Sequence, residues 1–160
     1  MDMELSAKDF WKAIGARAIG ATIVTAADEN GPAGFVALSA THFSASPPTM
    51  TVAIGENTSA LKPILETGMF AINFLSAEGR AIYERFSSRD APKGAERFAG
   101  FDWSAGAEGL PIFKATTAVI ECRLEDHIKR GDTYLLFGRI TGLHHDQDAK
   151  PLISFAGKLM

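Results

Sequence analysis

Short apolar segments rich in β-branched residues recur along this chain of 160 residues, and turn residues join most of them. Such segments are typical of strands, and hairpin turns between them make neighbouring strands antiparallel. Two stretches, DENG at residues 28–31 and RGD at residues 130–132, have the composition of such turns. We expect strands at residues 21–26, 34–38, 50–54, 70–75, 116–126, 133–140 and 152–155. The pattern predicts a mainly β fold, an antiparallel barrel of six or seven strands with helical attachments.

Three other segments have helical signals. Ser6, with Asp9 three residues later, is a candidate N-cap for a first helix whose apolar stripe would dock on the domain. That stripe comprises Phe10, Ala13, Ile14 and Arg17. Ser59 is expected to cap a second helix at residues 60–67, and a third helix is expected at residues 78–86.

The organisation of the chain indicates one domain over residues 1–160, because no repeat or low-complexity linker interrupts it. Residues 87–110 are predicted to form an ordered loop of unusual length, and long loops in compact domains tend to be functional. The net charge of −3 argues against a nucleic-acid partner, since binding to phosphates needs a clustered basic excess. The acidic N-terminal residues and the lack of a long apolar segment predict a cytoplasmic protein with no membrane partner.

Several catalytic classes lack the residues that they need. No glycine-rich loop ends in Gly-Lys-Ser/Thr, no Gly-x-Gly-x-x-Gly is present, and Ser104 lacks the first glycine of a nucleophile elbow. Cys122 alternates onto an apolar strand face, so we expect a buried, inert thiol. No metal site is expected, because none of the histidines has zinc-site spacing: His42, His127, His144 and His145.

The segment at residues 34–48 (GFVALSATHFSASPP) contains the clearest functional signal, since a strand there leads into hydroxyl side chains and two prolines. Backbone donors and short hydroxyls at the rim of a barrel can hydrogen-bond a flat heterocycle with polar edges. A serine-rich loop that ends a strand and binds nothing has the same composition.

This segment resembles the flavin-contacting motif of the short-chain flavin reductases, Gly-x-Thr-Ala-Ser-Ser-x-x-Ser-x-Ser-x-x-Pro-Pro. Residues 70–78 (FAINFLSAE), Gly131-Asp132, 137–140 (FGRI) and Gly157-Lys158 follow in the order found in that family. The resemblance implies a split barrel that binds FMN or FAD, normally as a homodimer with the flavin near the subunit interface.

The resemblance also implies roles for individual residues. Val36, Ala37, Leu38 and Ser39 would meet the isoalloxazine edge, largely through backbone groups. Ser44 would lie beside the ribityl chain or the phosphate. Asn57, Thr58 and Ser59 resemble the phosphate-side loop of the family, to which Lys62 would add positive charge. Arg89 and Arg97 are competing partners for the phosphate. Thr133 and His42 are candidates for the nicotinamide side of the catalytic site.

Two positions depart from the family pattern. Thr133 stands where many members have the histidine of Gly-Asp-His, and it can hydrogen-bond but cannot become a cation. Leu38 replaces a residue that is often serine or asparagine, which removes one polar contact to the ring.

The leading hypothesis is an NAD(P)H-dependent flavin reductase, in which hydride passes from the nicotinamide C4 to the flavin N5. The reduced flavin would serve a partner oxygenase. A second hypothesis is a reductase that keeps its flavin and reduces another acceptor, such as a corrinoid, a ferric chelate or a quinone. A third is a split-barrel protein that holds flavin or haem without catalysis, and a fourth is an interaction domain that binds no cofactor.

Overall fold

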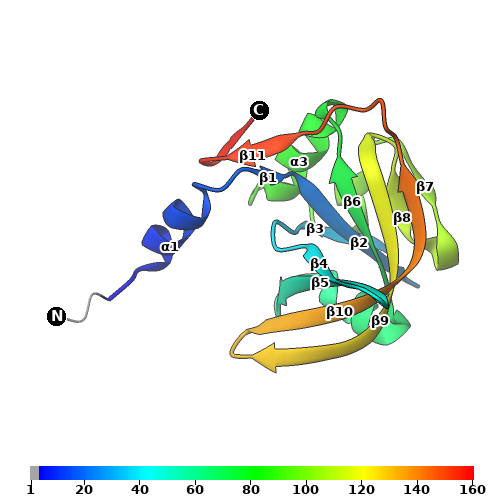
Figure 1. Ribbon diagram of the computed structural model, residues 1–160. Coiled ribbons are helices and arrows are strands. Elements are labelled where there is room, and N and C mark those ends of the chain that lie inside the picture. Colours follow the sequence, from blue (N-terminus) through cyan, green and yellow to red (C-terminus); the bar gives the residue numbers. More distant parts are fainter. Residues whose placement is uncertain (1–3) are drawn as a thin grey trace.

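The computed structural model describes residues 4–160 and is built around a seven-stranded antiparallel sheet with the order β3-β2-β6-β9-β10-β5-β4 (Figure 1). Its strands are β2 (Thr22–Asp28), β3 (Gly31–Val36), β4 (Thr41–Ala45), β5 (Pro48–Gly55), β6 (Met69–Leu75), β9 (Thr116–Arg130) and β10 (Thr133–His145). The mainly β, antiparallel architecture is therefore confirmed. Within residues 4–160, the ladder of backbone hydrogen bonds runs from β3 to β4 and does not close on itself.

The hairpin turns form where their sequences indicate. Gly31 has a φ of 103° at the β2–β3 turn, and the carboxylate of Asp28 accepts a hydrogen bond from the backbone N–H of Asn30 at 2.8 Å. Gly131, with a φ of 56°, turns β9 into β10. Glycine adopts such positive φ values without steric cost. The β9–β10 hairpin extends beyond the predicted strands, since residues 127–130 pair with residues 133–136 and residues 142–145 pair with residues 118–121.

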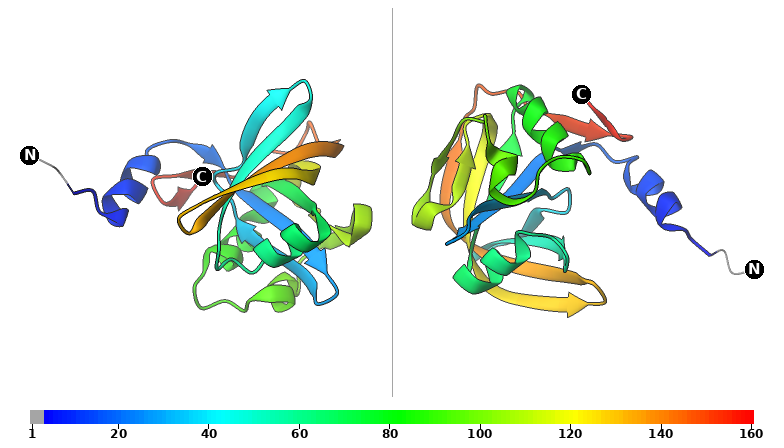
Figure 2. Two further views of the ribbon diagram at one scale, coloured as in Figure 1. Left: turned by 90° about the horizontal axis from the view of Figure 1, so that it is seen from below. Right: turned by 180° about the vertical axis from the view of Figure 1, so that it is seen from behind.

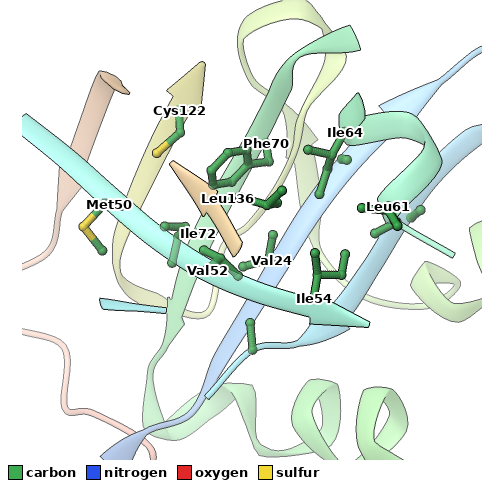
Figure 3. Packing of buried hydrophobic residues seen from close by; sticks show 14 residues of the cluster. Val24, Met50, Val52, Ile54, Leu61, Ile64, Phe70, Ile72, Cys122 and Leu136 are labelled. Atoms are coloured by element: carbon green, nitrogen blue, oxygen red, sulfur yellow. The ribbon is translucent and has the colours of Figure 1, made fainter. Parts of the chain in front are cut away.

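The hydrophobic core has two main clusters, one on each side of the curved sheet. The first includes Val24, Val52, Phe70 and Leu136, and the helix α2 (Leu61–Thr67) covers it with Leu61 and Ile64 (Figure 3). The second lies beneath the helix α3 (Arg80–Ser87) and contains Ile23, Ile82, Phe86, Phe98 and Phe113. Cys122 is fully buried in the first cluster, as predicted.

The segment predicted as a loop at residues 87–110 contains regular structure. It includes η2 (Gly94–Phe98), β7 (Trp103–Ala105) and η3 (Ala107–Gly109), and β7 pairs with β8 (Pro111–Phe113). The ring of Phe98 stacks on that of Phe113, with centroids 5.4 Å apart and planes 5° apart. This segment contributes Phe98 and Leu110 to the core, while its other residues are exposed or half-buried.

Asn73 fastens this segment to the sheet. Its buried side-chain amide donates to the carbonyl of Ile23 at 3.2 Å and to the hydroxyl of Thr25 at 3.1 Å. Its Oδ1 accepts a hydrogen bond from the backbone N–H of Phe113 at 3.0 Å. All these groups are buried, so removing the amide would leave several of them without partners.

The helix α1 (Ala7–Ile14) begins as predicted, because the Ser6 hydroxyl accepts a hydrogen bond from the backbone N–H of Asp9 at 3.1 Å. The expectation that its apolar stripe docks on the domain is wrong, since no residue of α1 is buried. Figures 1 and 2 show α1 projecting from the body of the molecule.

The N-cap predicted for α2 is also wrong. Ala60 occupies the cap position, and its methyl side chain cannot make a capping hydrogen bond. A turn from Thr58 to Leu61 precedes the helix. α2 ends at Gly68, which has a left-handed φ of 71°. The third expected helix is η1 (Ala77–Gly79) followed by α3.

Segments near the two ends of the chain form a second small sheet. In it, β1 (Ile19–Gly20) pairs with β11 (Ile153–Phe155), which pairs with β12 (Lys158–Leu159). The backbone N–H of Ala156 also donates to the carbonyl of Gly15 at 2.8 Å. These bonds fix the position at which α1 leaves the domain. Among residues 4–160, no helix is both long and apolar enough to cross a membrane.

Candidate functional site

A cleft of about 810 Å³ lies between α1 and the sheet, within the size range of small-molecule sites. Residues from α1 and the chain after it form one wall, which we call the α1 wall. These are Phe10, Trp11, Ile14 and Arg17. Residues at the ends of β3, β5 and β10 form the other wall, which we call the sheet wall. These include Val36, Ala37, Leu38, Ser39, Thr58 and Thr133. Most of the surface is therefore apolar, with hydroxyl and backbone groups on the sheet wall.

Two backbone donors on the sheet wall have no acceptor within residues 4–160. β3 ends at Val36, and the N–H of Ala37 donates to the carbonyl of Thr22 at 3.0 Å. The N–H groups of Leu38 and Ser39 make no such hydrogen bond. Leu38 is half-buried and Ser39 is exposed, so these two N–H groups are left to bond water or a ligand.

The Ser39 hydroxyl links the end of β3 to β5. It accepts a hydrogen bond from the backbone N–H of Ala53 at 3.1 Å and donates to the carbonyl of the same residue at 3.2 Å. The sheet ladder does not close at this point, and the Ser39 hydroxyl makes the two hydrogen bonds to Ala53 that a neighbouring strand would otherwise make. The Ser39 side chain is therefore committed to the protein, and its backbone is the part that can bind a ligand.

Thr133 and Thr58 bring two hydroxyls to the same wall. Thr133 starts β10 and lies opposite Gly55 at the end of β5. Its hydroxyl donates to the Asp132 carboxylate at 3.0 Å, which leaves the oxygen lone pairs free to accept.

A shallower hollow of about 560 Å³ shares Thr58 with the cleft. It brings together four of the predicted residues, Asn57, Thr58, Ser59 and Lys62. The Lys62 ammonium lies 3.8 Å from the Glu66 carboxylate and is largely exposed, so it remains able to move toward an anion. Glu56 and Glu66 also line this hollow, so polar groups, one cation and two carboxylates adjoin the apolar cleft.

Two predicted site residues lie outside the cleft. His42 and Ser44 belong to β4, the edge strand, and neither lines the cleft. The Ser44 hydroxyl donates to the carbonyl of Pro47 at 2.7 Å.

The arginines of residues 87–110 also lie away from the cleft lining. The Arg97 Nε donates to the carbonyl of Pro92 at 2.8 Å, and its guanidinium lies 5.4 Å from the centre of the Phe86 ring. Arg89 does not line the cleft either.

The residues that the sequence did not indicate are those of the α1 wall, together with Tyr83, Ser154 and Gly157. The apolar stripe of α1 was visible as helical spacing, but spacing alone indicated docking on the core. In the structure these side chains remain exposed, at 51% for Phe10 and 66% for Trp11. The sequence pattern of such a helix is the same as that of a helix that docks on the core.

The cleft contains no arrangement suited to nucleophilic or metal chemistry. Its titratable lining residues are Arg17 and Tyr83. Within residues 4–160 no group of three or more histidine, cysteine or carboxylate side chains could hold a metal ion. Burial raises the pKa of the Cys122 thiol to about 12, so this cysteine is not a nucleophile at neutral pH. The arrangement is suited to binding flat, partly polar molecules.

Comparison with known proteins points to one family. The family model described as "Flavin reductase like domain" matches residues 15–160. A protein from Rhizobium meliloti named "Probable flavin reductase" is 37% identical over 134 residues, which are 83% of this chain and 42% of that protein. The FMN reductase (NADH) RutF from Ancylobacter novellus is 32% identical over 84% of this chain and 74% of its own length.

A solved structure shares the fold over nearly the whole chain. The crystal structure of nitrilotriacetate monooxygenase component B from Mycobacterium thermoresistibile superposes with a TM-score of 0.86 and 30% sequence identity. The match covers 96% of this chain and 84% of that chain. By contrast, this chain spans less than half the length of the R. meliloti relative.

Proposed function

The chain belongs to the flavin reductase-like family, and we propose that it is an NAD(P)H-dependent flavin reductase that supplies reduced flavin to a partner oxygenase. The observation that carries this proposal is the cleft, which is large enough for a planar cofactor and is lined by Leu38 and Ser39, whose backbone N–H groups have no acceptor within residues 4–160. The names of two relatives support the chemistry, since one is an NADH-dependent FMN reductase and the other is a monooxygenase component.

The residues present fit FMN or FAD. The N–H groups of Leu38 and Ser39 would donate to the polar edge of the isoalloxazine ring, and Val36 and Ala37 would contact it along the same wall. Asn57, Thr58, Ser59 and Lys62 would surround the phosphate in the adjoining hollow. The contacts to the phosphate would come from hydroxyl and ammonium groups, so they would not depend on the N-terminus of the short helix α2.

Bound flavin would supply an acceptor for the hydride of the nicotinamide. The protein's part in this transfer is to position two flat rings in contact and to exclude water. The apolar side chains of the sheet wall would limit water beside the flavin, and the Thr133 hydroxyl would orient a polar substituent of the nicotinamide. A proton donor or nucleophile is not required for this step.

We further propose that two copies of the chain form the homodimer expected from the resemblance, in which His42 and Ser44 approach the partner's cleft. Apolar side chains support this arrangement, because they remain exposed on β4, β9 and β10. Phe43 is 62% exposed and packs edge-on against Phe137, with ring centroids 5.3 Å apart. Ile128 and Leu135 are also exposed. Contiguous exposed apolar surface is typical of protein interfaces.

An absorption spectrum of the purified protein, followed by anaerobic addition of NADH and then NADPH, tests the proposed function. We expect bleaching of the flavin bands, and rapid turnover when free FMN or FAD is added in excess. Turnover only with another acceptor would favour a reductase that retains its flavin. A yellow protein that leaves both nicotinamides unoxidised would refute the reductase and favour a binding protein. Light scattering on a sizing column would test the dimer.

A further inference from the structure

Of the residues from 4 to 160 that line the cleft, Arg17 is the one charged residue. The chain carries a net charge of −3, yet no aspartate or glutamate of this described part shares the lining. Within residues 4–160 the Arg17 side chain has no ion pair and no hydrogen bond, although five other ion pairs form there. A lone guanidinium beside apolar surface attracts an anionic group, with which it can form paired hydrogen bonds.

The backbone holds Arg17 in place without restricting its side chain. The N–H of Arg17 donates to the carbonyl of Ile14 at 3.2 Å at the end of α1, and the nearby Gly15 carbonyl is bonded to Ala156. The side chain itself is exposed. A cation on a fixed backbone with a free side chain can bind a ligand at little cost in stability.

The two walls of the cleft offer separate places for phosphate groups. The hollow beside Thr58, with Asn57, Ser59 and Lys62, adjoins the sheet wall, where the proposed flavin would bind. Arg17 belongs to the α1 wall, which also contains Trp11, whose indole adds a flat apolar surface. A second nucleotide that stacks on the flavin must lie on the α1 side, because the sheet wall is occupied by the flavin itself.

We propose that Arg17 binds the diphosphate of the nicotinamide dinucleotide on the α1 wall of the cleft. This inference rests on the proposed function, since it requires flavin on the sheet wall. The diphosphate is common to NADH and NADPH, so Arg17 contributes to the affinity for both and does not select between them.

Calorimetric titration with ADP-ribose tests this assignment, because ADP-ribose carries the diphosphate but lacks the nicotinamide and cannot react. The flavin-loaded wild type would be compared with Arg17→Ala, Arg17→Glu and Arg17→Lys. We expect the Kd for ADP-ribose to rise about tenfold in Arg17→Ala and further in Arg17→Glu, with partial recovery in Arg17→Lys. The Kd for FMN should stay within about twofold of the wild-type value.

Lys12→Glu is the matched control, because Lys12 is an exposed residue of α1 that does not line the cleft. It changes the net charge by the same amount as Arg17→Glu and should leave ADP-ribose binding unchanged. Equal effects of the two glutamate variants would refute the role of Arg17, as would wild-type protein without measurable ADP-ribose affinity. A rise in the Kd for FMN instead would assign Arg17 to the flavin phosphate. Wild-type protein that binds no flavin would refute the proposed function itself.

Discussion

The Ser39 hydroxyl bonds both the N–H and the carbonyl of Ala53, at 3.1 and 3.2 Å, and so joins the end of β3 to β5 across the opening in the sheet. One side chain thereby satisfies two backbone groups on a strand whose opposite edge pairs with β10. The same residue lines the cleft, and its own N–H has no acceptor within residues 4–160. Its contributions to the fold and to the proposed flavin site are therefore coupled.

Replacing Ser39 by alanine removes both bonds and leaves the polar groups of Ala53 without partners. We expect Ser39→Ala to lower the free energy of unfolding by about 1–2 kcal/mol and to raise the Kd for FMN. Urea denaturation and a flavin titration measure the two effects. Ser104→Ala is the control, since Ser104 is exposed on β7 and outside the cleft. Equal stability of the two variants would show that the Ser39 bridge contributes little.

A carboxylate at position 59 would enter the hollow in which the flavin phosphate is proposed to lie. We expect Ser59→Glu to raise the Kd for FMN about tenfold, or about 1.4 kcal/mol, through repulsion between like charges. Ser104→Glu introduces the same charge away from the hollow and should leave the Kd unchanged. If riboflavin, which lacks the phosphate, loses as much affinity as FMN, the hollow is not the phosphate site.

Thr133 is expected to act on the nicotinamide and not on the flavin. Removing its hydroxyl in Thr133→Val should raise the KM for NADH about fivefold, which corresponds to about 1 kcal/mol for one hydrogen bond. The Kd for FMN should not change. Thr141→Val alters the same strand outside the cleft and should leave both constants at their wild-type values. If Thr133→Val changed only the Kd for FMN and not the KM for NADH, Thr133 would be assigned to flavin binding instead.

The buried Cys122 makes stability depend on pH in the alkaline range. Burial raises the pKa of its thiol from 9.0 to about 12, so the folded state resists ionisation that the unfolded state undergoes. The resulting contribution to stability is fully present below pH 9.0 and is lost as the pH rises toward about 12. We expect the free energy of unfolding to fall less steeply above pH 9.0 in Cys122→Ala than in the wild type, as measured by urea denaturation. If the free energy of unfolding had the same pH dependence in both proteins, the thiol would be accessible in the folded state.

The core of the fold was predictable because local chemistry determines it. Gly31 and Gly131 supply the positive φ values of the two hairpins, and Cys122 lies on an apolar alternating face. β4 was missed because it is polar and exposed, and it is a strand only through its pairing with β5. The stacking of Phe98 on Phe113 depends on contacts between distant residues, which propensity does not indicate.

The site was predictable only in part. The sequence indicated the sheet wall from residue types at a strand end, and the resemblance implied that residues 36–39 contact the ring largely through backbone groups. The fold uses the Ser39 hydroxyl to bond Ala53. Ser59 was expected to act as a helix cap, whereas it lies one residue before the cap position. The α1 wall depends on the direction in which a helix leaves the domain, and that direction is fixed by hydrogen bonds near the C-terminal end of the sequence.

The attachment of α1 through Gly15 and the short β1–β11 pairing has a consequence for the exchange of nucleotides. Since α1 contributes no side chain to either core cluster, it can fray or swing without disturbing the stable part of the molecule. Amide hydrogens of α1 should therefore exchange with solvent far sooner than those of β2 and β6. A ligand would then enter and leave the cleft through a local movement of α1, while the rest of the protein stays folded.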